Sequence, residues 1–380
     1  MSKPPQAHRF EVIGHAAVSA VRRAPGYSGR SALAVLAAGV EERAFPGAAF
    51  AVLHKNEAVL QGAVGHFTYD DDAPGVTLTT IFDLASVTKV VATTAMAMLL
   101  YDRGKLDLQQ RVIELLPAFQ SEGLRRERVT VAMLLVHSSG LPAYVRLFER
   151  ARTRAELIPL AMGCPLEAEP GTRAEYSDIG FILLGEILQR LAGEALDSFC
   201  SREIFQPLGM KCTFFNPASG RRTDIPPTVE DQSFRKRIVQ GEVHDENASV
   251  MGGVAGHAGL FSNTTDLMKF SKCLLGSGPA LFRPETVALF AERQPPPGSS
   301  RALGWDTPSS PSQSGKYFSQ HSFGHLGYTG TSLWIDAERQ IAIALLTNRT
   351  WPHRESQAIK KIRPAFHDAI MEELLGQNAR

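Results

Sequence analysis

The chain has 380 residues, of which 44% are hydrophobic and 21% are charged, and its 40 basic residues nearly balance 39 acidic ones. This composition is typical of an ordinary globular protein with room for one large or two modest domains. The formal net charge is only +1, and the arginine-rich patches are short and scattered. The sequence therefore has no charged surface that we expect to bind nucleic acid or anionic lipid.

No run of 18 or more apolar residues is present, so we expect no membrane span. The N-terminal stretch MSKPPQAHRFEVIGHAAVSAVRR lacks the apolar core and cleavage site of a secretory signal. The four cysteines show no CxxC spacing and are interpreted as free thiols rather than as a disulfide framework or a zinc site. These features predict a cytoplasmic protein.

The two ends of the chain carry the strand patterns. Residues 1–30 are polar with Pro and Gly, and we expect a flexible segment there. Apolar runs around short turns predict one hairpin near each end, and each hairpin adjoins a helix. The predicted elements are a helix at 31–40, strands at 47–53 and 58–64, strands at 331–336 and 340–347, and a helix at 357–375 closed by Gly376.

The middle of the chain has helical periodicity, interrupted by Pro and Gly turns. The predicted helices cover 90–103, 129–136, 181–191, 197–205, 266–275 and 284–292. Residues 294–314, rich in Pro, Ser and Gly, are expected to form a loop or lid edge. We predict an α+β protein in which residues 31–83 and 300–380 form an α/β lobe and 84–299 a mainly helical lobe of one domain, with a cleft between them.

Ser86 and Lys89 lie in the apolar stretch LASVTKVVATTAMAMLL. On a helix, residues three apart share a face, so the hydroxyl and the amine are expected to meet. Burial among valines disfavours a charged lysine, which predicts an amine able to take a proton from the serine. Alone, this short pattern is more typical of a helix cap beside a solvent-exposed lysine.

Further segments resemble one enzyme family. FDLASVTKVVATTAMAMLLYDRGKLDL, VTVAMLLVHSSGLPAY, PGTRAEYSDIGFILLGEIL, GGVAGHAGLFSNTTDLMKF and GHLGYTGTSLWID occur in the family's order. The chain resembles the β-lactamase-related serine hydrolases, whose nucleophile motif is S-x-x-K at a helix start. The similarity is to the class C-like branch with penicillin-binding proteins, D,D-peptidases, D-aminopeptidases and esterases. It implies an antiparallel sheet flanked by helices, plus a helical lobe.

By this resemblance Ser86 is the acylated nucleophile and Lys89 its proton partner. Tyr176, in the place of the tyrosine of a Tyr-x-Asn motif, is the general base and acid. A nearby lysine ammonium is expected to lower the pKa of its phenol.

The family's third motif, Lys-Thr-Gly or a histidine variant, fits two registers: His325-Leu326-Gly327 or Tyr328-Thr329-Gly330. We favour the first, because His325 supplies a donor or partial cation and Gly327 lets substrate approach the strand. The N–H of Tyr328 then joins that of Ser86 as an oxyanion hole.

Two departures from the family pattern bear on the substrate. Asp178 replaces the usual asparagine, which removes an amide donor and is expected to hold Lys89 protonated more firmly. Leu326 lacks the hydroxyl that helps to hold a substrate carboxylate in β-lactam-binding members. Both disfavour recognition of penicillin-like substrates.

Other candidate sites carry less weight. His244, Asp245 and His257 lack the spacing of metal ligands and are interpreted as turns and a cleft-lining loop, so no metal or cofactor is predicted. His137 and the serines after it are expected to cap a helix and build a turn. The absence of a G-x-S-x-G sequence argues against an α/β-hydrolase.

The sequence thus predicts a serine hydrolase that cleaves a small ester, amide or peptide-like substrate through an acyl-serine intermediate. The leading interpretation is a carboxylesterase-like enzyme with weak or no β-lactamase activity. Alternatives are a D,D-peptidase or D-aminopeptidase, an amidase acting on muropeptides, a β-lactamase, and a catalytically inactive penicillin-binding-like protein. No oligomeric state is predicted.

Overall fold

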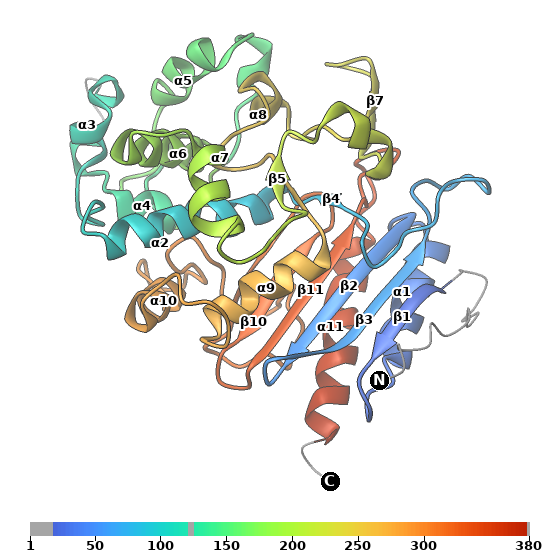
Figure 1. Ribbon diagram of the computed structural model, residues 1–380. Helices are drawn as coiled ribbons and strands as arrows, with labels where there is room; N and C mark the ends of the chain where they lie inside the picture. Colours follow the sequence, from blue (N-terminus) through green and yellow to red (C-terminus); the bar gives the residue numbers. More distant parts are fainter. Residues whose placement is uncertain (1–17, 121–124, 378–380) are drawn as a thin grey trace.

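The computed structural model describes residues 18–120 and 125–377. Its main feature is a six-stranded antiparallel sheet with the strand order β1-β3-β2-β11-β10-β9, built from both ends of the chain (Figure 1). The strands are β1 (Val18–Arg23), β2 (Gly47–His54), β3 (Glu57–Gly65), β9 (Phe323–Leu326), β10 (Ser332–Asp336) and β11 (Ile341–Thr347). The two predicted hairpins join through β2 and β11, whose register pairs Ala51 with Ala344.

Alternating side chains of the sheet enter two separate hydrophobic cores. Phe50 and Ile343 face the helices α1 (Arg30–Glu41) and α11 (Ile359–Gln377), which pack on each other behind the sheet. Ala51 and Ala344 face the opposite way, toward the large core shared with the helical lobe. Helix α9 (Thr264–Leu274) lies directly on this second face, against β2 and β11.

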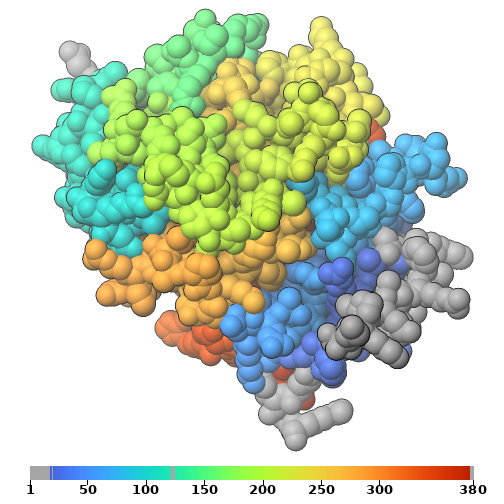
Figure 2. Space-filling model, viewed as in Figure 1, coloured from blue at the N-terminus to red at the C-terminus, as the bar shows by residue number. Residues whose placement is uncertain are grey.

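The helical lobe covers one end of the sheet (Figure 1). It contains α2 (Ala95–Asp102), α3 (Val112–Leu115), α4 (Val131–Leu135), α5 (Arg154–Met162), α6 (Asp178–Ala192), α7 (Leu196–Cys200), α8 (Glu246–Val250) and α10 (Pro284–Ala291). Two small sheets complete it: β4 (Phe82–Asp83), β8 (Leu260–Ser262) and β5 (Phe214–Phe215), and the hairpin of β6 (Val229–Asp231) and β7 (Arg237–Val239). Figure 2 shows the chain between α6 and α8, in yellow-green, covering much of the upper front surface.

The predicted helices and hairpins are all present, with three differences. Part of the segment 1–30 that we expected to be flexible forms β1, which pairs with β3; residues 1–17 lie outside the described residues. The segment 264–274, assigned by sequence to the helical lobe, instead packs on the sheet. Helix α11 also continues through Gly376 rather than ending before it. The division into two lobes at residues 84 and 299 remains a proposal.

All four cysteines are unpaired, as predicted. Among the described residues no helix is both long and apolar enough to cross a membrane.

Candidate active site

The segment around Ser86 is a tight turn rather than the start of a regular helix. Ser86 lies in a 3-10 turn, Ala85–Val87, followed by a π-helix, Lys89–Thr94, and only then by α2. Ala85 has a positive φ of 46°, and its N–H donates to Oδ1 of the buried Asp83 at 2.8 Å. A non-glycine residue in this region of φ is strained and persists only where surrounding contacts hold it. The turn therefore presents Ser86 in a conformation held by the preceding strand.

Lys89 is fully buried and makes three hydrogen bonds through Nζ. The acceptors are Ser86 Oγ at 3.0 Å, Asp178 Oδ1 at 2.6 Å and the carbonyl oxygen of His257 at 3.1 Å. An ammonium group has three donors and no acceptor, so these contacts satisfy it completely.

The charge state of Lys89 differs from the expectation of a neutral amine. Burial lowers the pKa of Lys89, but the carboxylate of Asp178, helped by Tyr176, more than offsets burial, so the pKa lies above its ordinary value. The prediction that Asp178 keeps Lys89 protonated agrees with this direction. The raised pKa favours the ammonium form of Lys89, which donates to Ser86 Oγ.

Tyr176 lies beside both residues. The Nζ atom of Lys89 is 4.8 Å from the centre of its ring. Burial raises the pKa of Tyr176, and the charge of Lys89 and contacts with Lys89 and Ser86 only partly offset this effect. The expectation of a lowered phenol pKa is therefore wrong in direction, because desolvation outweighs the nearby cation.

The start of α6 positions Asp178 and Tyr176. Ser177 caps this helix: its Oγ accepts from the N–H of Gly180 at 3.0 Å and donates to the carbonyl of Pro142 at 2.7 Å. The backbone N–H of Ser177 donates to Nδ1 of His137 at 3.0 Å, and the ring of His137 stacks on Tyr176 with centroids 4.7 Å apart. His137 thus supports the tyrosine, a role in addition to the predicted turn.

Strand β9 brings the third segment to the site. Nδ1 of His325 lies 2.8 Å from the carbonyl oxygen of Leu326, and its ring centroid is 5.9 Å from that of Tyr176. Burial lowers the pKa of His325 well below its usual value, and Lys89 and Arg301 act in the same direction, so the ring is neutral. His325 consequently offers a hydrogen-bonding nitrogen but not the partial cation that we expected.

The residues after β9 separate the two possible registers of the third motif. Thr329 is fully buried and donates to the carbonyl of Asp83 at 2.8 Å, while Thr331 donates to the carbonyl of Leu84 at 2.9 Å. A Cβ on Gly327 would lie 1.9 Å from Thr331 Oγ1 and 2.5 Å from the Leu84 carbonyl oxygen. Gly327 therefore permits close approach of the Ser86 segment, not only of a substrate. These contacts favour His325-Leu326-Gly327 as the segment facing the site.

A cavity of about 280 Å³ opens beside Ser86. Tyr176, His325, Leu326, Gly327 and Tyr328 line it together with a group of cationic side chains. These are Arg301 from the loop between α10 and β9, Arg349 after β11, and Lys360 and Arg363 from α11. The predicted residues Ser86, Tyr176, His325, Gly327 and Tyr328 therefore share one cavity, with Lys89 and Asp178 directly behind Ser86.

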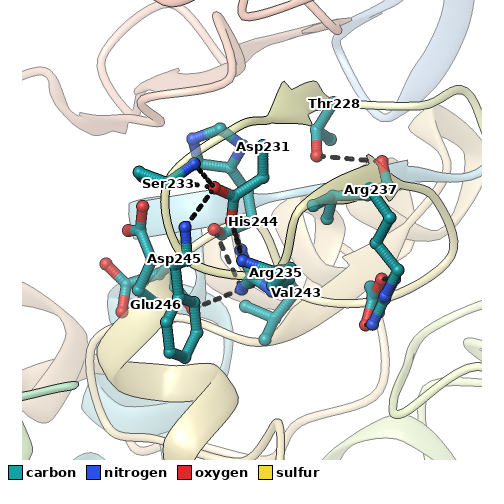
Figure 3. Close-up of polar contacts among 12 residues, drawn as sticks. Thr228, Asp231, Ser233, Arg235, Arg237, Val243, His244, Asp245 and Glu246 are labelled. Atoms are coloured by element: carbon teal, nitrogen blue, oxygen red, sulfur yellow. Dashed lines mark hydrogen bonds and ion pairs between the residues drawn. The ribbon is translucent and has the colours of Figure 1, made fainter. Parts of the chain in front are cut away.

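The loop at 243–257 supports this arrangement from behind. Arg235, held by the carboxylate of Asp231, donates to the carbonyl groups of residues 243, 244 and 245 (Figure 3). His244 donates its backbone N–H to Asp83 at 2.6 Å, and Asp245 pairs with His257 at 2.8 Å. No cluster of three metal-ligating side chains occurs among the described residues.

The cationic side chains of the cavity and Arg235 were not identified as site residues from the sequence. Each arginine lies far from the motifs in the chain, and an isolated arginine carries no pattern. For Arg349 the sequence offers only the pair Arg349-Thr350 shortly after strand β11, and two residues are too few to indicate a binding site.

A serine whose oxygen contacts a lysine one turn later, with a tyrosine from a second segment beside both, defines a serine hydrolase of the penicillin-binding type. Comparison with known proteins agrees with this class. The Beta-lactamase family model matches residues 33–364, and the chain belongs to that family. It is an enzyme of the serine hydrolase class, as predicted.

Two curated relatives are similar along most of the chain. An N-acetylmuramyl-L-alanine amidase of Bacillus subtilis (strain 168) is 34% identical over 342 residues, covering 80% of this chain and 77% of the relative. A putative D-alanyl-D-alanine carboxypeptidase of Salmonella paratyphi B is 31% identical over 347 residues, covering 81% and 79%. The solved structure of EstCE1, a hydrolase with promiscuous acyltransferase activity, has a TM-score of 0.74 at 20% identity and covers 90% of this chain and 98% of that one. The last similarity supports the fold.

Proposed function

We propose that Ser86 is the acylated nucleophile and Tyr176 its general base and acid. The support is geometric: the Lys89 ammonium donates to Ser86 Oγ and cannot accept its proton, which leaves Tyr176 as the neighbouring acceptor. Because burial raises the pKa of Tyr176, only a small fraction of this phenol is ionised near neutral pH. That phenolate takes the serine proton as the acyl bond forms, and the resulting phenol returns it to the leaving group. The N–H groups of Ser86 and Tyr328 hold the oxyanion, because Thr329 and Thr331 fix the two segments together.

We further propose that the substrate is an amide that carries a carboxylate. The observation that carries this proposal is a pair of buried guanidinium groups in the cavity, Arg349 and Arg363, with exposed fractions of 7% and 5%. In the described part of the chain neither has a carboxylate within ion-pair distance. Burial and the neighbouring Arg349 lower the pKa of Arg363 to about 9, the effect expected where charges of one sign lack a counter-ion. A substrate carboxylate would supply it in bidentate geometry.

The two cavity arginines make an anionic amide a better candidate substrate than the ester that we favoured from the sequence. The case for esters rested partly on Leu326, which lacks a hydroxyl for a substrate carboxylate. Arg349 and Arg363 offer stronger donors at the same cavity, so the missing hydroxyl no longer argues against anionic amides. We therefore propose an amidase acting on small muramyl peptides, the kind of bond named for the Bacillus relative. The second candidate is the carboxylesterase, favoured by Asp178 in place of an amide donor.

The test compares four substrates on the same enzyme. N-acetylmuramyl-L-alanyl-D-isoglutamine, which has a free carboxylate, should be cleaved to N-acetylmuramic acid faster than its neutral diamide analogue, as measured by liquid chromatography with mass spectrometry. Faster turnover of p-nitrophenyl butyrate, with no release of N-acetylmuramic acid, would refute the amidase proposal and favour the esterase. Release of D-alanine from a D-alanyl-D-alanine peptide alone would favour a carboxypeptidase.

A charge-removing variant tests the carboxylate site itself. Arg363→Gln should lower kcat/KM for the anionic muramyl peptide by about 10- to 100-fold, because a hydrogen bond to a charged group contributes about 1.5–3 kcal/mol. Turnover of the neutral p-nitrophenyl ester should stay unchanged. Lys361→Gln is the matched control, because Lys361 lies on the same helix but is exposed and paired with Glu42. Equal losses with anionic and neutral substrates would contradict the assignment.

A further inference from the structure

Arg301 is a cavity residue that belongs to none of the motifs recognised in the sequence. It lies in the loop between α10 and β9, and its guanidinium carbon is 5.2 Å from the centre of the Tyr176 ring. It lines the same cavity as Ser86 and His325. A guanidinium over the face of a phenol ring is attracted to it, and more strongly once the phenol ionises.

The charge of Arg301 is only weakly compensated. Among the described residues its ion-pair partner is Asp306, at 3.7 Å, which is longer than a hydrogen bond. The other oxygen of that carboxylate accepts from Ser300 Oγ at 2.6 Å and from the N–H of Thr307 at 3.1 Å. Asp306 therefore holds the loop through these hydrogen bonds. It compensates the positive charge of Arg301 only in part, and the rest of that charge acts on the groups in the cavity.

The other groups around Tyr176 carry little net charge. The charged and titratable side chains that face it are Lys89, Asp178, His137, His325 and Arg301. The first two form an ion pair at 2.6 Å and neutralise each other. Burial lowers the pKa of both histidines well below the usual value, with Arg301 contributing to each, so both rings are neutral. Among these groups Arg301 is thus the cation whose paired carboxylate, Asp306 at 3.7 Å, lies beyond hydrogen-bond distance.

We propose that Arg301 stabilises the ionised form of Tyr176 and so sets the pH at which Ser86 becomes reactive. The third motif carries a neutral histidine where many family members have lysine, and Arg301 supplies a cation from a different segment of the chain. It acts through Tyr176 and is a positioning residue rather than a group that touches the reacting carbonyl. This inference rests on the proposed role of Tyr176 as proton carrier but not on the identity of the natural substrate.

The experiment measures the rate of Ser86 labelling by short pulses of a fluorophosphonate probe from pH 5 to pH 12, because the pKa of Tyr176 is raised and the midpoint lies in the alkaline range. Ser86→Ala is the blank. In Arg301→Gln the midpoint of the rate profile should rise by about one pH unit, because an opposite charge within about 4–6 Å lowers the pKa of an acid by about 1–3 units and the Arg301 guanidinium carbon lies 5.2 Å from the centre of the Tyr176 ring. The labelling rate at pH 7 should then fall about tenfold, while the plateau at high pH is retained. Arg301→Lys should restore most of the shift.

The matched control is Arg293→Gln in the same region. Arg293 binds Thr307 Oγ1 at 2.9 Å and the carbonyl of Pro308 at 2.6 Å, so its loss perturbs the loop without removing a charge from Tyr176. Its labelling midpoint should equal that of the wild type. A uniform fall in rate for Arg301→Gln at every pH, with an unchanged midpoint, would overturn the proposal and assign Arg301 a structural role.

Two further results separate this inference from the proposed substrate. A wild-type midpoint in Arg301→Gln, combined with a raised KM for the anionic muramyl peptide only, would place Arg301 in the carboxylate site and refute its action on Tyr176. If the enzyme does not cleave muramyl peptides, the substrate proposal fails. The pH profile of Ser86 labelling still tests the role of Arg301, because the probe is not a muramyl peptide. If Arg301→Gln does not fold, Arg301→Lys decides the question, because a shorter cation should give a smaller upward shift.

Discussion

Replacing Asp178 with Asn removes the ion pair between Asp178 and Lys89 and so measures its contribution to stability. With an effective dielectric constant of about 20, opposite charges 2.6 Å apart attract by about 6 kcal/mol before the cost of desolvation. Breaking a buried pair by removing one partner typically costs about 3–5 kcal/mol. The side chain of Asp178 is 16% exposed, and Lys89 can lose its proton in the variant. We therefore expect Asp178→Asn to lower the free energy of unfolding by about 3 kcal/mol at pH 7.

The pH dependence of this loss gives the sharper test. In the wild type the folded-state pKa of Lys89 is raised, so its stabilising contribution is fully present below the unfolded value and is lost only at higher pH. Without the Asp178 carboxylate, burial dominates and the folded-state pKa of Lys89 falls below that of the unfolded chain. The unfolded state then binds more protons, and the stability of Asp178→Asn rises with pH.

Urea denaturation at pH 7 and pH 9 measures both effects. The difference in free energy of unfolding between wild type and Asp178→Asn should shrink at the higher pH. Glu186→Gln is the control, because its partner Arg154 cannot lose a proton and the loss should not vary with pH. An Asp178→Asn loss that is negligible at pH 7, or identical at both pH values, would refute the ion-pair reasoning.

Three other substitutions test the site. Ser86→Ala should fold normally but lose about 10³-fold or more in hydrolysis, and an acyl adduct on another serine by mass spectrometry would refute the assignment. Tyr176→Phe should lower kcat by about 10²- to 10⁴-fold with little change in the melting temperature, whereas near-wild-type turnover would make the tyrosine a packing residue. Gly327→Ala should lower both stability and activity, because its Cβ would meet Thr331 and the backbone of Leu84, while Gly75→Ala, whose Cβ meets nothing within 4 Å, should leave the melting temperature unchanged.

The elements that the sequence predicted well are those whose pattern is local. Strands β2, β3, β10 and β11 alternate or run as apolar segments between clear turn residues, and the helices have a regular period. Strand β1 was missed because VSAVRR is short and ends in two arginines, and only its pairing with β3 makes it a strand. Helix α9 reads as helical from its sequence, but nothing in it indicates that it packs on the sheet.

At the site, too, features with a local sequence pattern were predictable, and features that depend on contacts in the folded chain were not. Ser86, Lys89 and Tyr176 could be named as candidates because they lie in recognisable motifs. Their protonation states were not predictable, since these depend on how completely burial and Asp178 act together in the folded chain. The cavity arginines were not predictable either, because no local pattern tells a buried guanidinium without a partner from an exposed one.

The hydroxyl groups of Thr329 and Thr331 bind the carbonyl groups just before Ser86, across 246 and 247 positions of the sequence. During translation, the nucleophile segment leaves the ribosome long before these threonines are made. The serine turn therefore lacks its supports while the nascent chain is incomplete, and the growing polypeptide cannot form the assembled cavity. Contacts this distant along the chain also slow folding, so we expect the appearance of activity to follow release of the finished chain with a measurable delay. We therefore expect the protein to be inactive until the segment with Thr329 and Thr331 and the hairpin of β10 and β11 that follows it have folded.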